Sequence, residues 1–176
     1  MEKEKRTLKF SEIFGFGAGG MFTYGFQLMI TGYYLLYYMT DIAGFSTVLA
    51  ASLYSTIQII KMVTMLFSGV IIDAINFRSG KYRTWVLVSG IGLGLFFPLS
   101  FFYYPLPQSV YVVVFMIIYT LQTLFYNVGW TAMRAVIGKV AKNKADVVAL
   151  NTSAQSAGTI SSILYGYIGY PILGIA

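Results

Sequence analysis

The sequence predicts an all-α integral membrane protein, and its composition and the lengths of its apolar runs carry this prediction. Hydrophobic residues make up 57% of the 176 positions and charged residues 10%, with a mean hydropathy of +0.72. A soluble domain carries roughly 25% charged residues. The apolar runs reach the ~20 residues that a helix needs to cross a hydrocarbon core. We therefore expect about five transmembrane helices.

Five such runs lie between charged or turn-forming breaks. They cover approximately residues 11–39, 47–72, 84–104, 109–134 and 147–174. In lipid only helices and closed barrels satisfy every backbone group, and runs of this length are too long for barrel strands. The sequence therefore predicts a short N-terminal segment, residues 1–10, and a helical bundle over residues 11–176.

Positive charge is concentrated on alternate connections. Eleven of the 12 Lys and Arg residues lie in the N-terminal segment and around residues 78–83 and 134–144, whereas residues 40–45 and 105–108 hold none. By the positive-inside rule this places the N-terminus in the cytoplasm of a cell membrane protein. Because the sequence ends at Ala176 in apolar residues, we expect a truncated bundle completed by a C-terminal half or a second copy.

The composition also excludes several functional classes. The chain has no Cys and no His, which removes disulfides, thiol nucleophiles, imidazole bases and most zinc or iron ligand sets. The acidic residues do not pair inside the apolar runs, so we expect no enzyme, no metal site and no cofactor. A net charge of +6 would suit nucleic acid, but the charges lie at the run ends. The expected partners are instead the lipid bilayer and a small solute.

Lys61 is the one basic residue deep in an apolar run. It lies about eleven residues, or ~16 Å at 1.5 Å per residue, from the predicted cytoplasmic end of the second run. A charge at that depth costs a few kcal/mol or more, so a role in ligand or ion handling is preferred over a structural lysine. No acid lies deep in a run. The lysine therefore meets a residue of a missing half, meets an anionic solute, or is uncharged through desolvation.

The fourth run carries polar and aromatic residues on one helical face. They recur at spacings of three and four and comprise Tyr119, Thr123, Asn127, Trp130 and Arg134. Such a face can hydrogen-bond and stack on a polyol, or it can join helices to one another. Both interpretations stay open. Tyr24 and Gln27 form a similar face in the first run.

Glycine and serine predict two local features. The glycines within residues 15–20 favour a flexible or broken first helix. They do not predict a phosphate-binding loop, because no strand precedes them and no Lys-Ser/Thr follows. In the fifth run, Gly158, Ser162 and Gly166 predict close helix packing.

Three motifs point to a family. They are Tyr-Leu-Leu-Tyr-Tyr-Met-Thr-Asp at residues 34–41, Gly-Lys-Tyr-Arg at residues 80–83 and Asn-Val-Gly-Trp at residues 127–130. The chain resembles the glycoside-pentoside-hexuronide:cation symporter family, the melibiose-permease branch of the major facilitator superfamily, in its N-terminal part. The resemblance implies alternating access, with a sugar-like solute bound between two six-helix halves.

The sequence departs from that family at the cation site. Lys61 and Met65 stand where the resemblance implies cation-binding aspartates. A fixed lysine satisfies similar electrostatics without a bound ion, so we expect facilitated or proton-linked transport in place of sodium coupling. The resemblance also implies an acid in the first helix, and residues 21–27 contain none.

These observations give a set of candidate residues and a rival interpretation. The candidate solute-binding residues are Tyr24, Gln27, Lys61, Asn127 and Trp130. The candidate cytoplasmic gate comprises Asp73, Arg78, Lys81 and Arg83, although ordinary positive-inside topology explains that loop equally well. The rival to a sugar or hexuronide transporter is a short structural or regulatory membrane protein, or a non-transporting remnant of a transporter.

Overall fold

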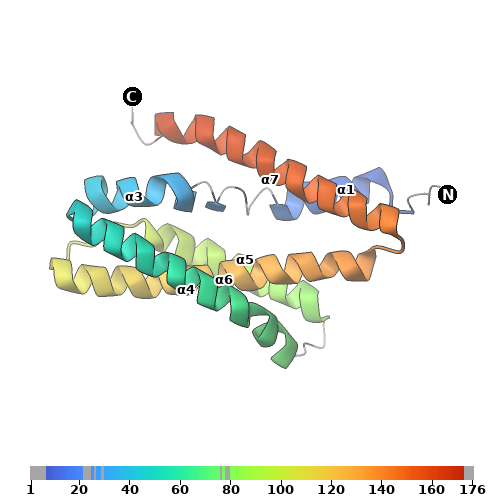
Figure 1. The fold of residues 1–176 in the computed structure, drawn as a ribbon, viewed down its shortest axis with the longest axis horizontal. Coiled ribbons are helices and arrows are strands. Elements are labelled where there is room, and N and C mark those ends of the chain that lie inside the picture. The colour runs from blue at the N-terminus through green and yellow to red at the C-terminus, as the bar shows by residue number, and fades with distance from the viewer. Residues whose placement is uncertain are drawn as a thin grey trace. The chain divides into compact units, whose positions relative to one another are not determined.

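The computed structural model describes residues 7–21, 25, 27–28, 30–75, 77 and 80–172, and these form helices and connecting turns without a strand. The chain divides into two compact units. The first contains the residues up to Tyr34 and those from Ala135 onward, and the second runs from Leu35 to Arg134. Figure 1 shows the helices of both units coloured along the chain.

The first unit begins with a short helix that changes its winding at glycine. Helix α1 (Phe10–Phe16) starts where Glu12 Oε2 accepts a hydrogen bond from the backbone N–H of Lys9 at 2.8 Å. A π-helical segment, η1 (Gly17–Met21), follows directly. A second π-helical segment, η2 (Ile30–Tyr34), lies at the end of this unit's N-terminal part, which stops at Tyr34. The run predicted over residues 11–39 is therefore not one regular α-helix, because its winding widens over Gly17–Met21 and again over Ile30–Tyr34.

Helix α7 (Lys144–Ile172) packs against this segment at backbone contact distance. A Cβ placed on Gly17 would lie 2.8 Å from the carbonyl oxygen of Ser153, and Ser153 Oγ donates a hydrogen bond to Ile13 O at 2.7 Å. A Cβ on Gly25 would lie 3.0 Å from Gly158 O. Close packing is thus present beside Gly158, but the contact requires the glycine at position 25, because a Cβ on Gly158 itself would meet nothing within 4 Å.

The second unit contains three long helices and the end of the first predicted run. Its elements are α3 (Leu35–Tyr37), the π-helical η3 (Tyr38–Ile42), α4 (Thr47–Ala74), α5 (Lys81–Ser100) and α6 (Gln108–Val140), of which α6 continues into the first unit. Ser46 caps α4 by accepting a hydrogen bond from Leu49 N–H at 3.3 Å. Gly80, with φ of +101°, forms the turn before α5. Helix α6 runs six residues beyond the end predicted at residue 134.

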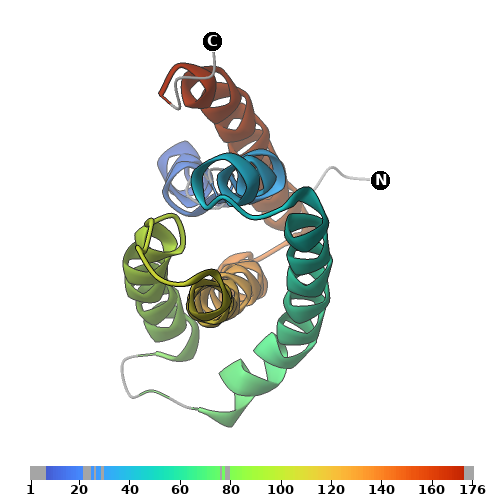
Figure 2. The same ribbon diagram turned by 90° about the vertical axis from the view of Figure 1, so that its left-hand side faces the viewer.

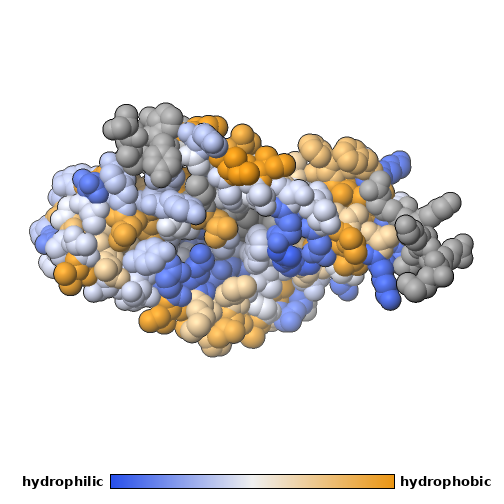
Figure 3. Space-filling view, turned by 45° about the horizontal axis from the view of Figure 1, so that its top comes forward, coloured by the Kyte–Doolittle hydropathy of each residue, from blue (hydrophilic) through white to orange (hydrophobic). Residues whose placement is uncertain are grey.

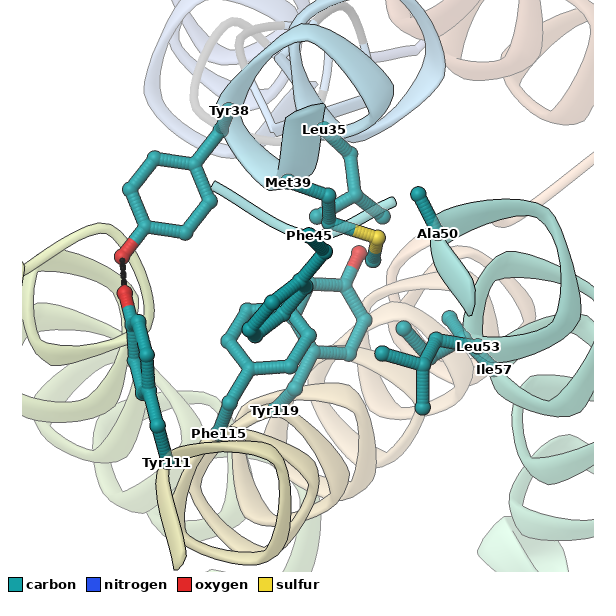
Figure 4. Close-up of a cluster of buried hydrophobic side chains, with 10 residues drawn as sticks. All are labelled: Leu35, Tyr38, Met39, Phe45, Ala50, Leu53, Ile57, Tyr111, Phe115 and Tyr119. Carbon is teal, nitrogen blue, oxygen red and sulfur yellow. Dashed lines mark hydrogen bonds between the residues drawn. The ribbon is translucent and has the colours of Figure 1, made fainter. Parts of the chain in front are cut away.

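Aromatic side chains fill the core of the second unit. Figure 4 shows Tyr38 pointing toward Tyr111, with the rings of Phe45, Phe115 and Tyr119 between these two tyrosines and the aliphatic side chains of α4. The buried residues of this core cluster are Leu35, Tyr38, Met39, Phe45, Ala50, Leu53, Ile57, Tyr111, Phe115 and Tyr119. A second cluster joins all three long helices through Ile72, Trp85 and Val128. Figure 2 shows α6 nearly end-on, between α4 and α5.

The long helices of the second unit expose apolar residues. Among the described residues, α4, α5 and α6 are long and apolar enough to cross a membrane. Val48 and Ile91 leave more than 70% of their surface exposed, and apolar side chains open to the surface are visible in Figure 3. Transmembrane helices present such side chains to lipid. The two spans over residues 11–39 and 147–174 stay predictions.

Candidate functional site

Lys61 lies near the middle of α4 and packs against an aromatic ring. Its Nζ is 5.6 Å from the ring centroid of Tyr126 on α6. The one ion pair among the described residues joins Asp73 to Lys81, so no carboxylate of the described chain pairs with Lys61. A cation against an aromatic face gains about 2 kcal/mol when both are desolvated. The ring therefore offsets only part of the burial of the ammonium group.

Tyr126 belongs to a stack of rings and cations along α6. The rings of Tyr126 and Trp130 are stacked with centroids 6.4 Å apart and planes 12° apart. The guanidinium carbon of Arg134 lies 4.6 Å from the Trp130 ring centroid. We call Lys61, Tyr126, Trp130 and Arg134 the cation–aromatic stack. It presents two positive groups, with two rings between them, within the second unit.

Asn127 joins α6 to α4. The side chain is 2% exposed, and its Nδ2 donates hydrogen bonds to Lys61 O at 2.9 Å and to Thr64 Oγ1 at 2.7 Å. Ser68 Oγ and Thr131 Oγ1, one turn further along, lie 2.7 Å apart. Both amide hydrogens of Asn127 are thus used between the helices. This contact favours the helix-joining interpretation for Asn127.

The five predicted solute-binding residues do not all lie in the same unit. Lys61, Asn127 and Trp130 all lie in the second unit and are linked through Tyr126 and Thr64. Gln27 lies in the first unit, where it is buried and its backbone O accepts a hydrogen bond from Thr31 Oγ1 at 2.9 Å. Tyr24 falls outside the described residues. The structure therefore assembles three of the five candidates.

The predicted gate contains a real ion pair. Lys81 Nζ lies 2.5 Å from Asp73 Oδ1 and 5.9 Å from the ring centroid of Tyr82. The Asp73 side chain is 74% exposed, so this pair contributes little to stability, as exposed pairs usually do. Arg83 is exposed on the first turn of α5, and Arg78 falls outside the described residues. The pair fixes the end of α4 relative to the start of α5.

Sequence reasoning missed two partners of the candidate residues. Tyr126 holds the Lys61 ammonium group, and Thr64 accepts a hydrogen bond from Asn127. The signal for Thr64 was its spacing of four from Ser68, because both then lie on one face of α4. Tyr126 precedes Trp130 by the same spacing. Neither spacing shows which face of α6 meets which face of α4.

Comparison with known proteins identifies the kind of protein. The model of a family described as MFS/sugar transport protein matches residues 15–176. YagG of Escherichia coli (strain K12), which is named as a glycoside/cation symporter, is 27% identical over 150 residues, covering 84% of this chain and 32% of the relative. The isoprimeverose transporter of Lactiplantibacillus pentosus is 23% identical over 169 residues, covering 96% of this chain and 35% of the relative.

The relatives are much longer than this chain. The inner membrane symporter YicJ of Escherichia coli (strain K12) is 24% identical, covering 74% of this chain and 29% of the relative. The chain thus spans about a third of the length of these curated relatives. No solved structure matches it. The matches identify a multi-pass membrane protein related to transporters and not to enzymes, in agreement with the resemblance in the three motifs.

Proposed function

We propose that this chain, which belongs to the MFS/sugar transport protein family, forms part of a secondary transporter for a sugar, glycoside or hexuronide-like solute. Transport would proceed by alternating access, with this bundle as one side of the solute pathway and a further half or a second copy as the other. The relatives named as a glycoside/cation symporter and an isoprimeverose transporter support a solute of the sugar class.

The position of Lys61 carries the proposal at the level of residues. Its ammonium group lies against Tyr126, halfway along an apolar helix. Trp130, stacked on the same ring, adds a flat apolar face, which suits the C–H face of a sugar ring. A cation beside such a face fits a solute that carries a carboxylate, such as a uronide. The hydroxyl-rich part of the solute would use the Oδ1 atom of Asn127, and Gln27 and Tyr24 stay candidates from the sequence.

We further propose that Lys61 takes the place of a coupling cation. A lysine fixed at one position, when protonated, would supply the electrostatic effect of a bound ion and remove the need for sodium. Transport would then be facilitated or linked to protons. Asp73, Arg78, Lys81 and Arg83 would act at the cytoplasmic end, where breaking the Asp73–Lys81 pair would accompany opening.

Solute uptake tests these proposals. Vesicles containing the longest product of the reading frame are given labelled neutral sugars and uronides, with and without sodium and proton gradients. We expect uptake that ignores sodium in the native protein and gains sodium dependence in Lys61→Asp. Met62→Ala is the matched control, because Met62 is exposed on the same helix. Unchanged uptake and solute choice in Lys61→Ala would contradict the role given to the lysine.

The rival function makes a different prediction in the same vesicles. A structural or regulatory membrane protein, or a remnant, would take up no solute from either panel under any gradient. Inspection of the reading frame beyond Ala176 separates a fragment from a complete short chain.

The proposed orientation needs its own test. We propose a cytoplasmic N-terminus in the cell membrane, because the basic residues gather on the N-terminal segment and on alternate loops. A cysteine introduced at Tyr103, in the loop without basic residues, should react with an impermeant thiol reagent added outside intact cells. Labelling of a cysteine at Lys142 instead would reverse the orientation.

A further inference from the structure

A buried carboxylate in the first unit holds the N-terminal segment in place. Asp146, in the first turn of α7, is 0% exposed. Its oxygens accept hydrogen bonds from Thr7 N–H at 2.8 Å, Thr7 Oγ1–H at 2.5 Å, Leu8 N–H at 3.1 Å and Lys142 N–H at 3.3 Å. We call Asp146, Thr7, Leu8 and Lys142 the N-terminal latch. It joins residues that are more than 130 positions apart.

The hydrogen bonds of the latch keep Asp146 charged. Burial by itself would raise the pKa of this carboxyl group, but the bonds from Thr7, Leu8 and Lys142 lower its pKa to about 2. The carboxylate is also bound into the helix start, because Asp146 N–H donates to Asn143 Oδ1 at 2.8 Å. The latch is therefore a firm connection at neutral pH, and the negative charge it contains is hidden from solvent.

The latch gathers lysines from two distant parts of the chain. Lys9 follows the latched Leu8 directly, and Lys142 is itself a latch residue. All of the lysines at this place have exposed side chains: Lys9, Lys139, Lys142 and Lys144. Among the residues that the structure describes, Glu12 is the exposed acid beside them. With Asp146 buried, the exposed charge of this surface is positive.

Large apolar side chains lie beside these lysines. Phe10 and Phe14 on α1 are 71% and 61% exposed, and their rings are stacked with centroids 6.0 Å apart. On the first turns of α7, Val148 is 64% exposed. Cations beside exposed aromatic residues are the composition of segments that lie in the headgroup region of a membrane.

We propose that this surface binds anionic phospholipids of the membrane. We call it the leader surface, and it comprises Lys9, Phe10, Phe14, Lys139, Lys142 and Lys144. The lysines contact the lipid phosphates, and the two rings enter the boundary between headgroups and acyl chains. The match of charge favours a phospholipid over a second copy of this chain, whose same surface would also be positive. The latch positions Lys9 and the two rings for this contact.

Lipid quenching of a single tryptophan tests this surface. Phe14→Trp is made with Trp85 and Trp130 replaced by Phe, and the chain is reconstituted with brominated phosphatidylglycerol or brominated phosphatidylcholine at equal mole fraction. We expect stronger quenching by the anionic lipid. Tyr103→Trp in the same background is the matched control, because Tyr103 is an exposed aromatic residue in a loop without Lys or Arg. There the two lipids should quench equally.

Removal of charge should abolish the preference. A lysine near an anionic surface contributes about 1 kcal/mol, or about fivefold in relative affinity, so Lys139→Gln, Lys142→Gln and Lys144→Gln together should make the lipids equivalent. High salt should have the same effect on the chain with its lysines intact. That measurement does not require the triple variant to fold. Thr7→Val should weaken the preference by releasing Lys9, whereas Thr7→Ser should keep it.

Three results would overturn the proposal. The first is equal quenching by the two lipids at position 14. The second is a preference that persists in both high salt and the triple variant, since the lysines would then not be its source. A preference at position 103 as large as that at position 14 would likewise show that the leader surface is not selective.

Discussion

Each of the two units is held together internally by a different kind of contact. In the first, glycine and serine bring α7 against the N-terminal segment at backbone distance, and a buried carboxylate fastens the chain end. In the second, bulky aromatic rings fill the core and polar side chains join α4 to α6. The first unit should therefore be sensitive to added atoms, and the second to lost hydrogen bonds.

The largest effect is expected where a single carbon atom is added to the first unit. In Gly17→Ala the new Cβ would lie 2.8 Å from a backbone oxygen of Ser153, which cannot move without moving α7. Overpacking of this kind costs about 1–3 kcal/mol. A lower midpoint of thermal unfolding in detergent should report it. Gly19→Ala is the control, because a Cβ there meets nothing within 4 Å; an equal loss in both variants would contradict the packing argument.

The buried carboxylate should give the first unit a dependence on pH. The folded pKa of Asp146, about 2, lies below the ~3.9 of an unfolded aspartate. Its contribution to stability is therefore present above about pH 4 and is lost as the pH falls toward 2. Asp146→Asn should lower the unfolding temperature at neutral pH, because an amide nitrogen then faces N–H donors.

The same variant should also flatten the acid limb of the stability curve. Unfolding temperatures measured from about pH 5 to about pH 2 would show the difference from the unsubstituted chain. Asp41→Asn should keep the original slope, because Asp41 is exposed. If both variants flatten the curve alike, the pH dependence does not come from the latch.

A smaller effect is expected at the polar contact of the second unit. Removing the Asn127 amide in Asn127→Ala leaves Lys61 O and Thr64 Oγ1 without that donor. Coupling energies between polar residues on membrane helices average about 0.6 kcal/mol and reach about 1.7. A double-mutant cycle with Thr64→Val should give a value in that range. A cycle with Thr120→Val should give none, because Thr120 bonds to Met116 O of its own helix.

The sequence predicted the long helices of the second unit well. Apolar runs, bounded by Asp41, Gly80 and Pro105, located α4, α5 and α6 to within a few residues at most boundaries. The late end of α6 was missed, because residues 135–140 are apolar enough to continue a helix and Lys139 had been assigned to the loop. Hydropathy patterns predict helices, because the period and the length of a helix are local properties of the sequence.

The candidate site was only partly predictable. The depth of Lys61 is visible in the sequence, but its contact with Tyr126 depends on how α4 and α6 pack. Asp146 lies just before the fifth predicted run, and its full burial could not be predicted, because its donors include Thr7 and Leu8 at the other end of the chain. Contacts between distant segments cannot be read from spacing along one segment.

The smallest effect is expected at a pair of hydroxyl groups in the aromatic core. Tyr38 OH donates a hydrogen bond to Phe102 O at 2.9 Å and lies 2.7 Å from Tyr111 OH, as Figure 4 shows for the two tyrosines. Since the one hydroxyl hydrogen of Tyr38 is used on Phe102, Tyr111 is the donor between the rings. Tyr111→Phe then removes one hydrogen bond, worth about 0.6 kcal/mol between membrane helices, and Tyr38→Phe removes two.

The two variants should therefore differ in a fixed order. Thermal unfolding should show a loss in Tyr38→Phe about twice that in Tyr111→Phe, since hydrogen bonds of similar kind contribute similar amounts. Tyr33→Phe is the control. Because Tyr33 is exposed, this variant should unfold at the same temperature as the unsubstituted chain. Equal losses in the two variants would mean that Tyr38 donates to Tyr111 instead, because each variant then removes only that hydrogen bond, and that the contact with Phe102 O is not what holds the loop after α5 to η3.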